Sequence, residues 1–348
     1  MSGISNGRLS YWDNLKAILI FFVVLGHFLI PVYDKWRSTN TVFWWIYLFH
    51  MPAFVFVSGY FSKGYVRKKE ERVSRLLGFL ILYLGYIVLL WLLSIRSGKP
   101  LPSLSLFTTS RPPWYLLSMF FWYLLIPLFA QLPPALAVVV SVVFGLLIGT
   151  DSNAGHFLTM SRSFVFFPFF LAGYFFPGDK PKLSRPAIRI GGAVLLAAAF
   201  VLLFLKGMDN ISRLSILYGA ASYEKLHLSN IQGIFYRACW YAISSILVCA
   251  LFALIPEKRM FFTFIGERTI SIYIIHILIR DILIRIGAYK HFGEGKWMLL
   301  SCALVSCAVI ALSSIKWFSA FLNKAFHLPI RTAGKTEDDR SGSNGNGV

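Results

Sequence analysis

The chain has 348 residues, of which 57% are hydrophobic and only 14% are charged, and its formal net charge is +19. A soluble domain is typically about 45–50% apolar and about 25% charged, so this composition excludes an ordinary soluble protein and indicates a chain that crosses a membrane several times. The basic residues lie mostly in short loops between apolar stretches, which favours membrane topology and contact with membrane lipids over binding of nucleic acid.

Apolar stretches of transmembrane length recur along the chain. A helical span needs about 20 apolar residues, and the sequence predicts ten spans, at residues 15–33, 42–61, 76–95, 113–130, 134–150, 163–178, 188–206, 236–255, 265–286 and 297–317. We therefore expect an all-α polytopic membrane domain over residues 13–318. A cytoplasmic segment at 1–12 would precede it, and a cytoplasmic, largely disordered tail at 319–348 would follow it.

The loops predict an orientation. With ten spans, the loops after the second, sixth and eighth spans lie on the side of the N-terminus, and they hold a cluster of basic residues: Lys63, Arg67, Lys68, Lys69, Arg72, Arg75, Lys180, Lys182, Arg185, Arg189, Lys258, Arg259 and Arg268. The positive-inside rule then places both termini in the cytoplasm and the chain in the cell membrane as a multi-pass protein. The long loop at about 207–235 would lie outside, where it could cover a substrate.

The first span, "DNLKAILIFFVVLGHF" at 13–28, carries a cation and an imidazole. Lys16 and His27 are eleven residues apart, so they share one helix face at about 16 Å along the axis. Asp13 is three residues before Lys16 and can pair with it. Ionisable groups at membrane depth usually serve function, although Lys16 as a snorkelling anchor and His27 as a packing residue are the alternatives.

Three histidines from three spans are expected at a similar depth in the membrane. They are His27, His50 in the second span and His276 in the ninth, and together they predict a polar cavity. No two of them share a helix at the spacing of metal ligands, so no metal site is predicted. A histidine there suits a general base that acts on a hydroxyl.

A serine nucleophile is the alternative chemistry. Three serines lie in predicted spans, but none has a recognisable elbow motif: Ser58, Ser118 and Ser271.

Arginines flank two other spans. Arg72 and Arg75, in "RVSR", share a face where the third span begins, and two neighbouring guanidinium groups bind phosphate well; the alternative is ordinary positive-inside charge. Arg162 opens the sixth span on the outer side, where it either contacts a substrate or anchors the helix.

Taken in order, these motifs resemble the membrane-bound acyltransferase-3 family, particularly its fucose O-acetylase-like branch. Lys16 and His27 match the family's Arg/Lys-x10-His pattern, and the similarity extends over about residues 13–317. The other matching stretches are "RVSR", "FHMPAFVFVSGY" with His50, "PPWYLLSMF" with Trp114 and Tyr115, and "TISIYIIH" with Ser271, Tyr273 and His276. Lys16 departs from the Arg of many members, so a bidentate contact there would be lost.

The resemblance implies an O-acyltransferase that moves an acetyl or other short acyl group from cytosolic acetyl-CoA to a carbohydrate hydroxyl on the cell surface or a lipid carrier. It implies no permanently bound cofactor. His27 would be catalytic with support from Lys16 and Asp13, and Arg72, Arg75 and Lys16 would hold the CoA phosphates. The remaining candidates for substrate or oxyanion contacts are His50, Arg162, Trp114, Tyr115, Ser271, Tyr273 and His276.

A transporter or flippase for a polysaccharide or a lipid-linked sugar is the competing interpretation, because intramembrane His and Arg also line transport paths. Such proteins often contain internal repeats, and this sequence shows none.

Overall fold

The computed structural model describes residues 6–66, 69–95, 104, 106, 113–153, 155, 157–181, 183, 185–206 and 211–315. Ten helices of 14 or more residues form its framework: α1 (Asn6–Leu29), α2 (Arg37–Val66), α3 (Lys69–Ser94), α4 (Trp114–Phe129), α5 (Pro134–Leu147), α6 (Met160–Phe175), α7 (Pro186–Lys206), α9 (Asn230–Leu254), α11 (Thr269–Arg285) and α12 (Lys296–Ser313). Short helical turns lie between them: η1 (Ile148–Thr150), α8 (Ile211–Leu214), η3 (Ser215–Tyr218), η4 (Glu224–Leu226), α10 (Thr263–Gly266) and η5 (Ala288–His291).

Each predicted span coincides with one of the ten long helices, which confirms the all-α class. Six described segments are long and apolar enough to cross a membrane: Ser10–Leu29, Arg37–Gly64, Glu71–Ser94, Pro186–Lys206, Asn230–Leu254 and Lys296–Ser313. Helices α4, α5, α6 and α11 are shorter, with 14 to 17 residues. The chain is therefore a helical membrane protein, and the number of ten spans and the orientation stay predictions.

Among the described residues, the boundaries differ most at the start of the chain. Helix α1 begins at Asn6 and ends at Leu29, so residues 6–12 of the predicted N-terminal segment belong to the first helix. The predicted tail at 319–348, and Arg67, Lys68 and Lys182 in the basic loops, lie outside the described residues.

The start of α1 meets three other elements at one end of the bundle, which we call the N-terminal face. Trp12 Nε1 and the Tyr60 hydroxyl both donate to the carbonyl oxygen of Asp179, at 2.7 and 2.8 Å. Asn14 Nδ2 donates to the carbonyl oxygen of Pro256 at 2.8 Å. The end of α2 and the segments after α6 and α9 therefore gather around the first turns of α1.

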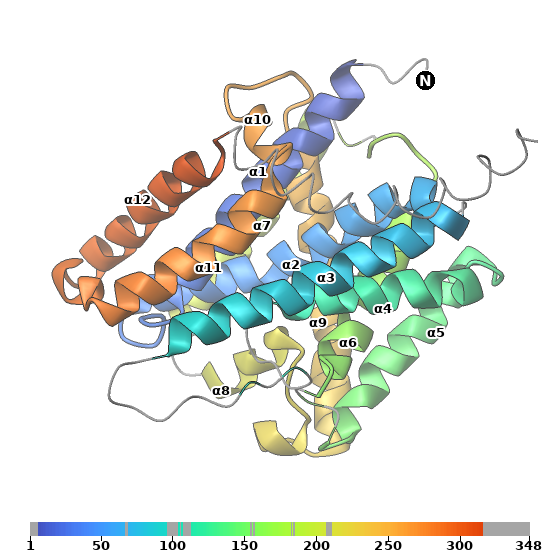
Figure 1. The fold of residues 1–348 in the computed structure, drawn as a ribbon, viewed down its shortest axis with the longest axis horizontal. Helices are drawn as coiled ribbons and strands as arrows, with labels where there is room; N and C mark the ends of the chain where they lie inside the picture. Colours follow the sequence, from blue (N-terminus) through green and yellow to red (C-terminus); the bar gives the residue numbers. More distant parts are fainter. Residues whose placement is uncertain are drawn as a thin grey trace, which may run out of the picture.

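The opposite end, which we call the far face, is closed by the segment 211–229. Tyr223 N donates to the carbonyl oxygen of Gly149 at 2.7 Å, and its hydroxyl donates to that of Leu146 at 2.6 Å. On the other side of the bundle, the Tyr289 hydroxyl donates to the carbonyl oxygen of Phe28 at 2.8 Å. In Figure 1, α12 and α5 lie at opposite edges of the bundle and α8 lies beyond its far face.

Helix α2 is the central element and packs against α6 at van der Waals limits. A Cβ added at Gly59 would lie 1.9 Å from the Phe170 carbonyl oxygen, and one at Gly173 would lie 1.9 Å from that of Phe56. Small residues of this kind let two helix backbones approach closely within a membrane. The N–H that Pro52 lacks leaves the Leu48 carbonyl free, and the Ser244 hydroxyl of α9 donates to it.

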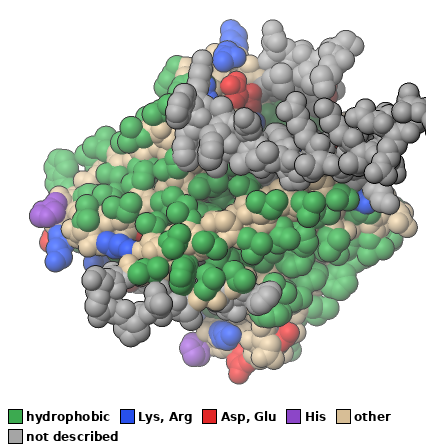
Figure 2. All heavy atoms as spheres, in the orientation of Figure 1, with side chains coloured by type: hydrophobic (Ala, Val, Ile, Leu, Met, Phe, Trp, Pro, Cys, Tyr) green, Lys and Arg blue, Asp and Glu red, His purple; other side chains and the backbone are tan. Residues whose placement is uncertain are grey.

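The outer surface is apolar along the helices. Large hydrophobic side chains are exposed on α3, α5 and α7, among them Ile81, Val139, Ile190 and Leu202. Figure 2 shows apolar side chains over most of the visible face, with charged ones gathered toward the ends of the helices. This is the surface expected of helices in contact with lipid.

We predict that Gly59→Ala destabilises the bundle and Gly64→Ala does not. Both changes add the same methyl group to α2 and the same helix propensity. Only the first forces a Cβ against the Phe170 carbonyl, whereas at Gly64 no heavy atom of the described residues outside the adjacent helix backbone lies within 4 Å of the added Cβ. Overpacking of this kind costs about 1–3 kcal/mol. Thermal unfolding in detergent, followed by tryptophan fluorescence, should show a lower midpoint for Gly59→Ala. Equal midpoints for the two variants would contradict this packing.

Candidate functional site

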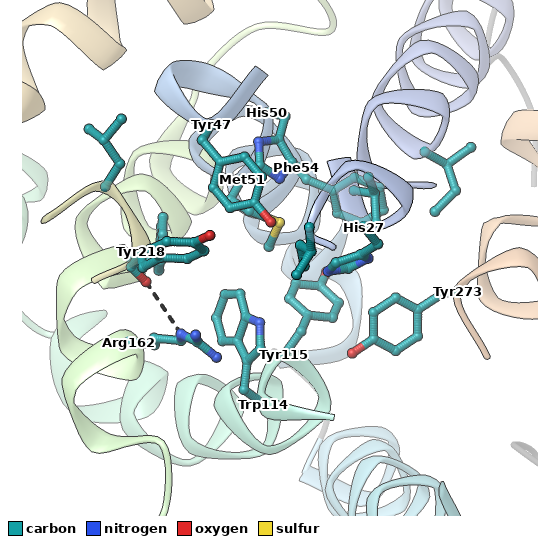
Figure 3. A pocket seen from close by; sticks show the side chains of 15 residues that line it. His27, Tyr47, His50, Met51, Phe54, Trp114, Tyr115, Arg162, Tyr218 and Tyr273 are labelled. Carbon is teal, nitrogen blue, oxygen red and sulfur yellow. Dashed lines mark hydrogen bonds between the residues drawn. The ribbon is translucent and has the colours of Figure 1, made fainter. Parts of the chain in front are cut away.

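A cavity opens between α1, α2, α4, α6 and α11, beneath η3 (Figure 3). Its volume is about 100 Å³, which is room for several water molecules or small substrate groups. Its described lining residues are Ile20, Val23, His27, Ile30, Tyr47, His50, Met51, Phe54, Trp114, Tyr115, Arg162, Phe166, Leu217, Tyr218 and Tyr273.

A pair of histidines forms one wall. His27 Nδ1 lies 2.8 Å from His276 Nε2, and the two rings stack with centroids 5.0 Å apart. His276 is fully buried behind His27, and its Nδ1 lies 2.8 Å from the Ile272 carbonyl oxygen, one turn earlier in α11. The pair therefore joins α1 to α11 through a chain that ends on the backbone.

These two linked hydrogen bonds determine which nitrogen of each ring carries a proton. A carbonyl oxygen only accepts, so Nδ1 of His276 carries a proton and donates to Ile272. In a neutral ring, His276 Nε2 is then an acceptor, and His27 Nδ1 donates to it. The free ring nitrogen of His27, Nε2, is left without a proton, on a residue that lines the cavity. That nitrogen is able to take a proton from a hydroxyl.

Other polar side chains in or next to the cavity already make hydrogen bonds within the protein. His50 Nδ1 donates to the Ile46 carbonyl oxygen at 2.8 Å, so a neutral His50 presents only an acceptor. The Ser58 hydroxyl donates to the Phe54 carbonyl oxygen at 2.8 Å and lies 2.5 Å from the Tyr115 hydroxyl, which is then the donor to Ser58. Neither Ser58 nor Tyr115 therefore has its hydroxyl proton free.

Arg162 of α6 stands across the cavity from His27 (Figure 3). Its Nε donates to the carbonyl oxygen of Tyr218 at 3.3 Å, and its guanidinium group lies 5.1 Å from the centre of the Trp114 ring. Burial raises the pKa of the Tyr218 phenol, so this side chain of the 211–229 segment stays protonated and neutral.

The cavity follows one face of α1 toward the N-terminal face. Ile20 and Val23 line the cavity, as does His27. These three residues follow Lys16 by four, seven and eleven positions, so all of them lie on the same side of α1 as Lys16. The lining thus reaches to within one helical turn of Lys16.

Lys16 lies one turn beyond this lining, toward the N-terminal face. Its Nζ pairs with Asp13 at 2.7 Å, which confirms the predicted pairing, and lies 5.1 Å from the centre of the Phe61 ring of α2. Phe61 is on the same face of α2 as Phe54 of the cavity lining, two turns further on. The contact between Lys16 and Phe61 therefore continues, beyond the cavity, the faces of α1 and α2 that line it.

The remaining predicted residues lie apart from the cavity. Arg72 and Arg75 are half-buried on the first turns of α3 and do not line it. Ser271 is buried in α11 outside the lining, and Ser118 pairs with Ser163 at 2.8 Å. The structure thus brings His27, His50, Trp114, Tyr115, Arg162 and Tyr273 together around the space, with His276 directly behind.

Sequence reasoning missed two tyrosines of the lining. Tyr47 lies one turn before His50 on the same face of α2, so helical periodicity could have found it. Tyr218 comes from η3, and no periodic pattern marks it. Leu217 and Tyr218 of the predicted long loop line the cavity, and none of the described charged residues of that loop does. That the loop covers a substrate stays a prediction.

Known sequences resemble this chain over most of its length. A family model described as an acyltransferase domain matches residues 9–317. The nodulation protein NolL of Sinorhizobium fredii is 25% identical over 352 aligned residues, which cover 90% of this chain and 89% of that protein. NolL of Mesorhizobium japonicum is 35% identical over 116 residues, covering 30% of this chain and 29% of that protein. No solved structure matches the chain.

We predict that His27 carries its ring proton on Nδ1 and that His276 sets this tautomer. In protein labelled with ¹⁵N-histidine, Nε2 of His27 should resonate as an unprotonated nitrogen, because His276 Nε2 accepts from Nδ1. His276→Gln keeps an acceptor and should preserve the pattern, whereas His276→Leu should allow the proton to move to Nε2. A proton on Nε2 of His27 in the unaltered protein would contradict the assignment. The signals of His27 are assigned as those that are absent from the spectrum of His27→Ala.

Proposed function

Because the chain belongs to the acyltransferase-3 family, we propose that it transfers an acetyl or other short acyl group from acyl-CoA to a hydroxyl of a cell-surface or lipid-linked carbohydrate. The observation that carries the proposal is the contact of His27 Nδ1 with His276 Nε2 at the wall of the cavity, from which we infer an unprotonated Nε2 on His27. No resident cofactor is needed for this chemistry, since the thioester is itself activated.

The acyl donor is expected to enter at the N-terminal face. Its basic residues make this face the cytosolic side by the positive-inside rule, with both termini inside and the chain in the cell membrane. The charged nucleotide end of the donor would stay at the rim, near Lys16, Arg72 and Arg75, because phosphates are costly to bury. Its uncharged arm would follow the apolar face of α1, past Ile20 and Val23, and bring the thioester to His27.

The transfer follows from this placement. His27 Nε2 takes the proton of the acceptor hydroxyl, and the oxygen attacks the thioester carbonyl carbon. The tetrahedral intermediate collapses with cleavage of the carbon–sulfur bond, and the thiolate leaves with the proton that His27 returns. The products are the carbohydrate ester and free CoA thiol. The imidazolium that forms in between is stabilised through Nδ1 by His276 and the Ile272 carbonyl.

The phenol of Tyr273 is a candidate for the oxyanion donor because of its position. It lines the cavity next to the histidine pair, with its ring 6.0 Å from that of His276. His50 is less suited, since its one ring proton already goes to Ile46, and the Tyr115 hydroxyl is bonded to Ser58.

The acceptor would enter from the far face, on the opposite side of the membrane from the donor. There the walls are the aromatic side chains Tyr47, Trp114 and Tyr218, and a sugar ring can stack its C–H surfaces on them while its hydroxyl groups reach His27. The cavity thus lets the two substrates meet from opposite faces, which brings their reacting atoms together.

We predict that His27→Ala abolishes acyl transfer. Removal of a general base lowers the rate by about 10²–10⁴-fold, and the change leaves His276 without its partner. The assay is release of CoA thiol from acetyl-CoA by the purified protein in detergent. His291→Ala, at an exposed histidine of η5, is the control and should keep full activity. Equal turnover by His27→Ala and the unaltered protein would remove His27 from the catalytic role.

We also predict that Arg72→Ala combined with Arg75→Ala raises KM for acetyl-CoA more than it lowers kcat. Loss of charge-assisted contacts to phosphate should raise KM by about 10–100-fold, while the reacting atoms lie elsewhere. Arg185→Ala combined with Arg189→Ala removes the same charge from exposed positions near the start of α7 and should leave KM close to its original value. An unchanged KM in the Arg72/Arg75 variant would make these two residues topology charges only.

A further inference from the structure

Arg162 carries hydrogen-bond donors that the fold does not use. The residue is only 9% exposed, and its described polar contact is the one from Nε to the Tyr218 carbonyl. Trp114 covers one face of the guanidinium group. Both Nη groups have no hydrogen-bond partner among the described residues, and none of the described residues that line the cavity is acidic.

Two other arginines show how this fold engages the Nη groups of such side chains. Arg237 is fully buried, and of its donors only Nε has no partner among the described residues, whereas Arg280 is half-buried. Arg237 donates from Nη1 to the Gly145 carbonyl at 3.1 Å and from Nη2 to that of Ala221 at 3.4 Å. Arg280 pairs with Asp281 at 2.6 Å. A buried cation without a counter-charge is costly, so the free donors of Arg162 point to a partner that comes from outside the chain.

The chemistry of the missing partner is an anionic oxygen group. A guanidinium fork matches the two oxygens of a carboxylate or a phosphate, and desolvation strengthens that contact. In the proposed function, the phosphates of the donor stay near Lys16 at the opposite end of the cavity. Arg162 instead contacts Tyr218 of the far-face segment, where the acceptor would enter.

We propose that Arg162 binds a carboxylate or phosphate group of the acceptor, so that the acceptor is an anionic carbohydrate. This proposal rests on the proposed function and names its acceptor class. With the anion held at Arg162 and His27 on the opposing wall (Figure 3), the sugar between them can present only the hydroxyl that the span of the cavity allows. Arg162 would thereby select the position of acylation as well as the acceptor.

The first experiment determines the charge of the product. Membranes that contain the protein are incubated with acetyl-CoA radiolabelled in the acetyl group, and the labelled carbohydrate is fractionated on an anion-exchange resin. We expect the label on the resin and not in the neutral fraction. Mild acid then separates the two sources, since a sugar held through a phosphate ester to a lipid loses its binding to the resin, whereas a carboxylate keeps it. Label in neutral carbohydrate overturns this proposal alone, and label in no carbohydrate overturns the proposed function with it.

The second experiment tests the role of Arg162 in the purified full-length protein. The ratio of transfer to the anionic acceptor over hydrolysis of acetyl-CoA is compared for the unaltered protein, Arg162→Lys and Arg162→Gln. We expect this ratio, and kcat/KM for the acceptor, to fall about 100-fold in Arg162→Gln. Arg162→Lys should fall less, because it keeps the charge but loses the fork. Arg213→Gln removes an exposed cation of α8 and should keep the original ratio.

Two outcomes of this comparison would overturn the proposal. If transfer and hydrolysis fall together in Arg162→Gln, the ratio stays constant, and the guanidinium group serves the thioester oxyanion instead of the acceptor. If neither rate changes, Arg162 binds no substrate group.

Discussion

The hydrogen bond between His27 and His276 is the interaction on which the site depends. It joins α1 to α11 through two residues that are 249 positions apart in the sequence. In apolar surroundings a ring N–H without an acceptor is costly, so the bond also fixes how the two helices are aligned. The same contact that satisfies two buried rings leaves a proton acceptor on the cavity side of His27. The alignment of the two helices and the tautomer of His27 therefore depend on the same hydrogen bond. A change that weakened the helix contact would also allow the ring proton of His27 to move from Nδ1 to Nε2.

Helix α2 explains why a cavity exists beside this pair. At 100° per residue, Phe56 and Gly59 lie on the side of α2 that touches α6, whereas Tyr47, His50 and Phe54 lie on the other side and line the cavity. The close approach at Gly59 holds α2 against α6. Polar and aromatic side chains then fill only part of the space that remains. Tight backbone packing on one face of α2 thus leaves open space at the other.

Helical periodicity predicted the single-helix features of the site, and tertiary packing set the rest. The spacing from Lys16 to His27 and the pairing of Lys16 with Asp13 depend only on one helix, so the sequence was sufficient. Similar depth for three histidines was also readable, but the partner of His27 was not, since hydropathy does not order helices around a bundle. The separation of Arg72 and Arg75 from the cavity has the same cause. Tyr218 is placed by a turn of the 211–229 segment whose conformation depends on contacts with α6.

The two cations of the path differ in what surrounds them, and this difference suits them to different substrates. Lys16 is at the rim, already paired with Asp13 and close to Phe61. Both side chains of this pair keep some exposure to solvent, so Lys16 can exchange Asp13 for a phosphate and return to Asp13 afterwards. Arg162 has no carboxylate to exchange among the described residues, and only the cavity gives it access to water. Its contact with an anion would be stronger and more selective for geometry. Lys16, whose partner can be exchanged, suits a donor that must enter and leave in every cycle. Arg162, which has no carboxylate partner among the described residues, suits the recognition of one acceptor.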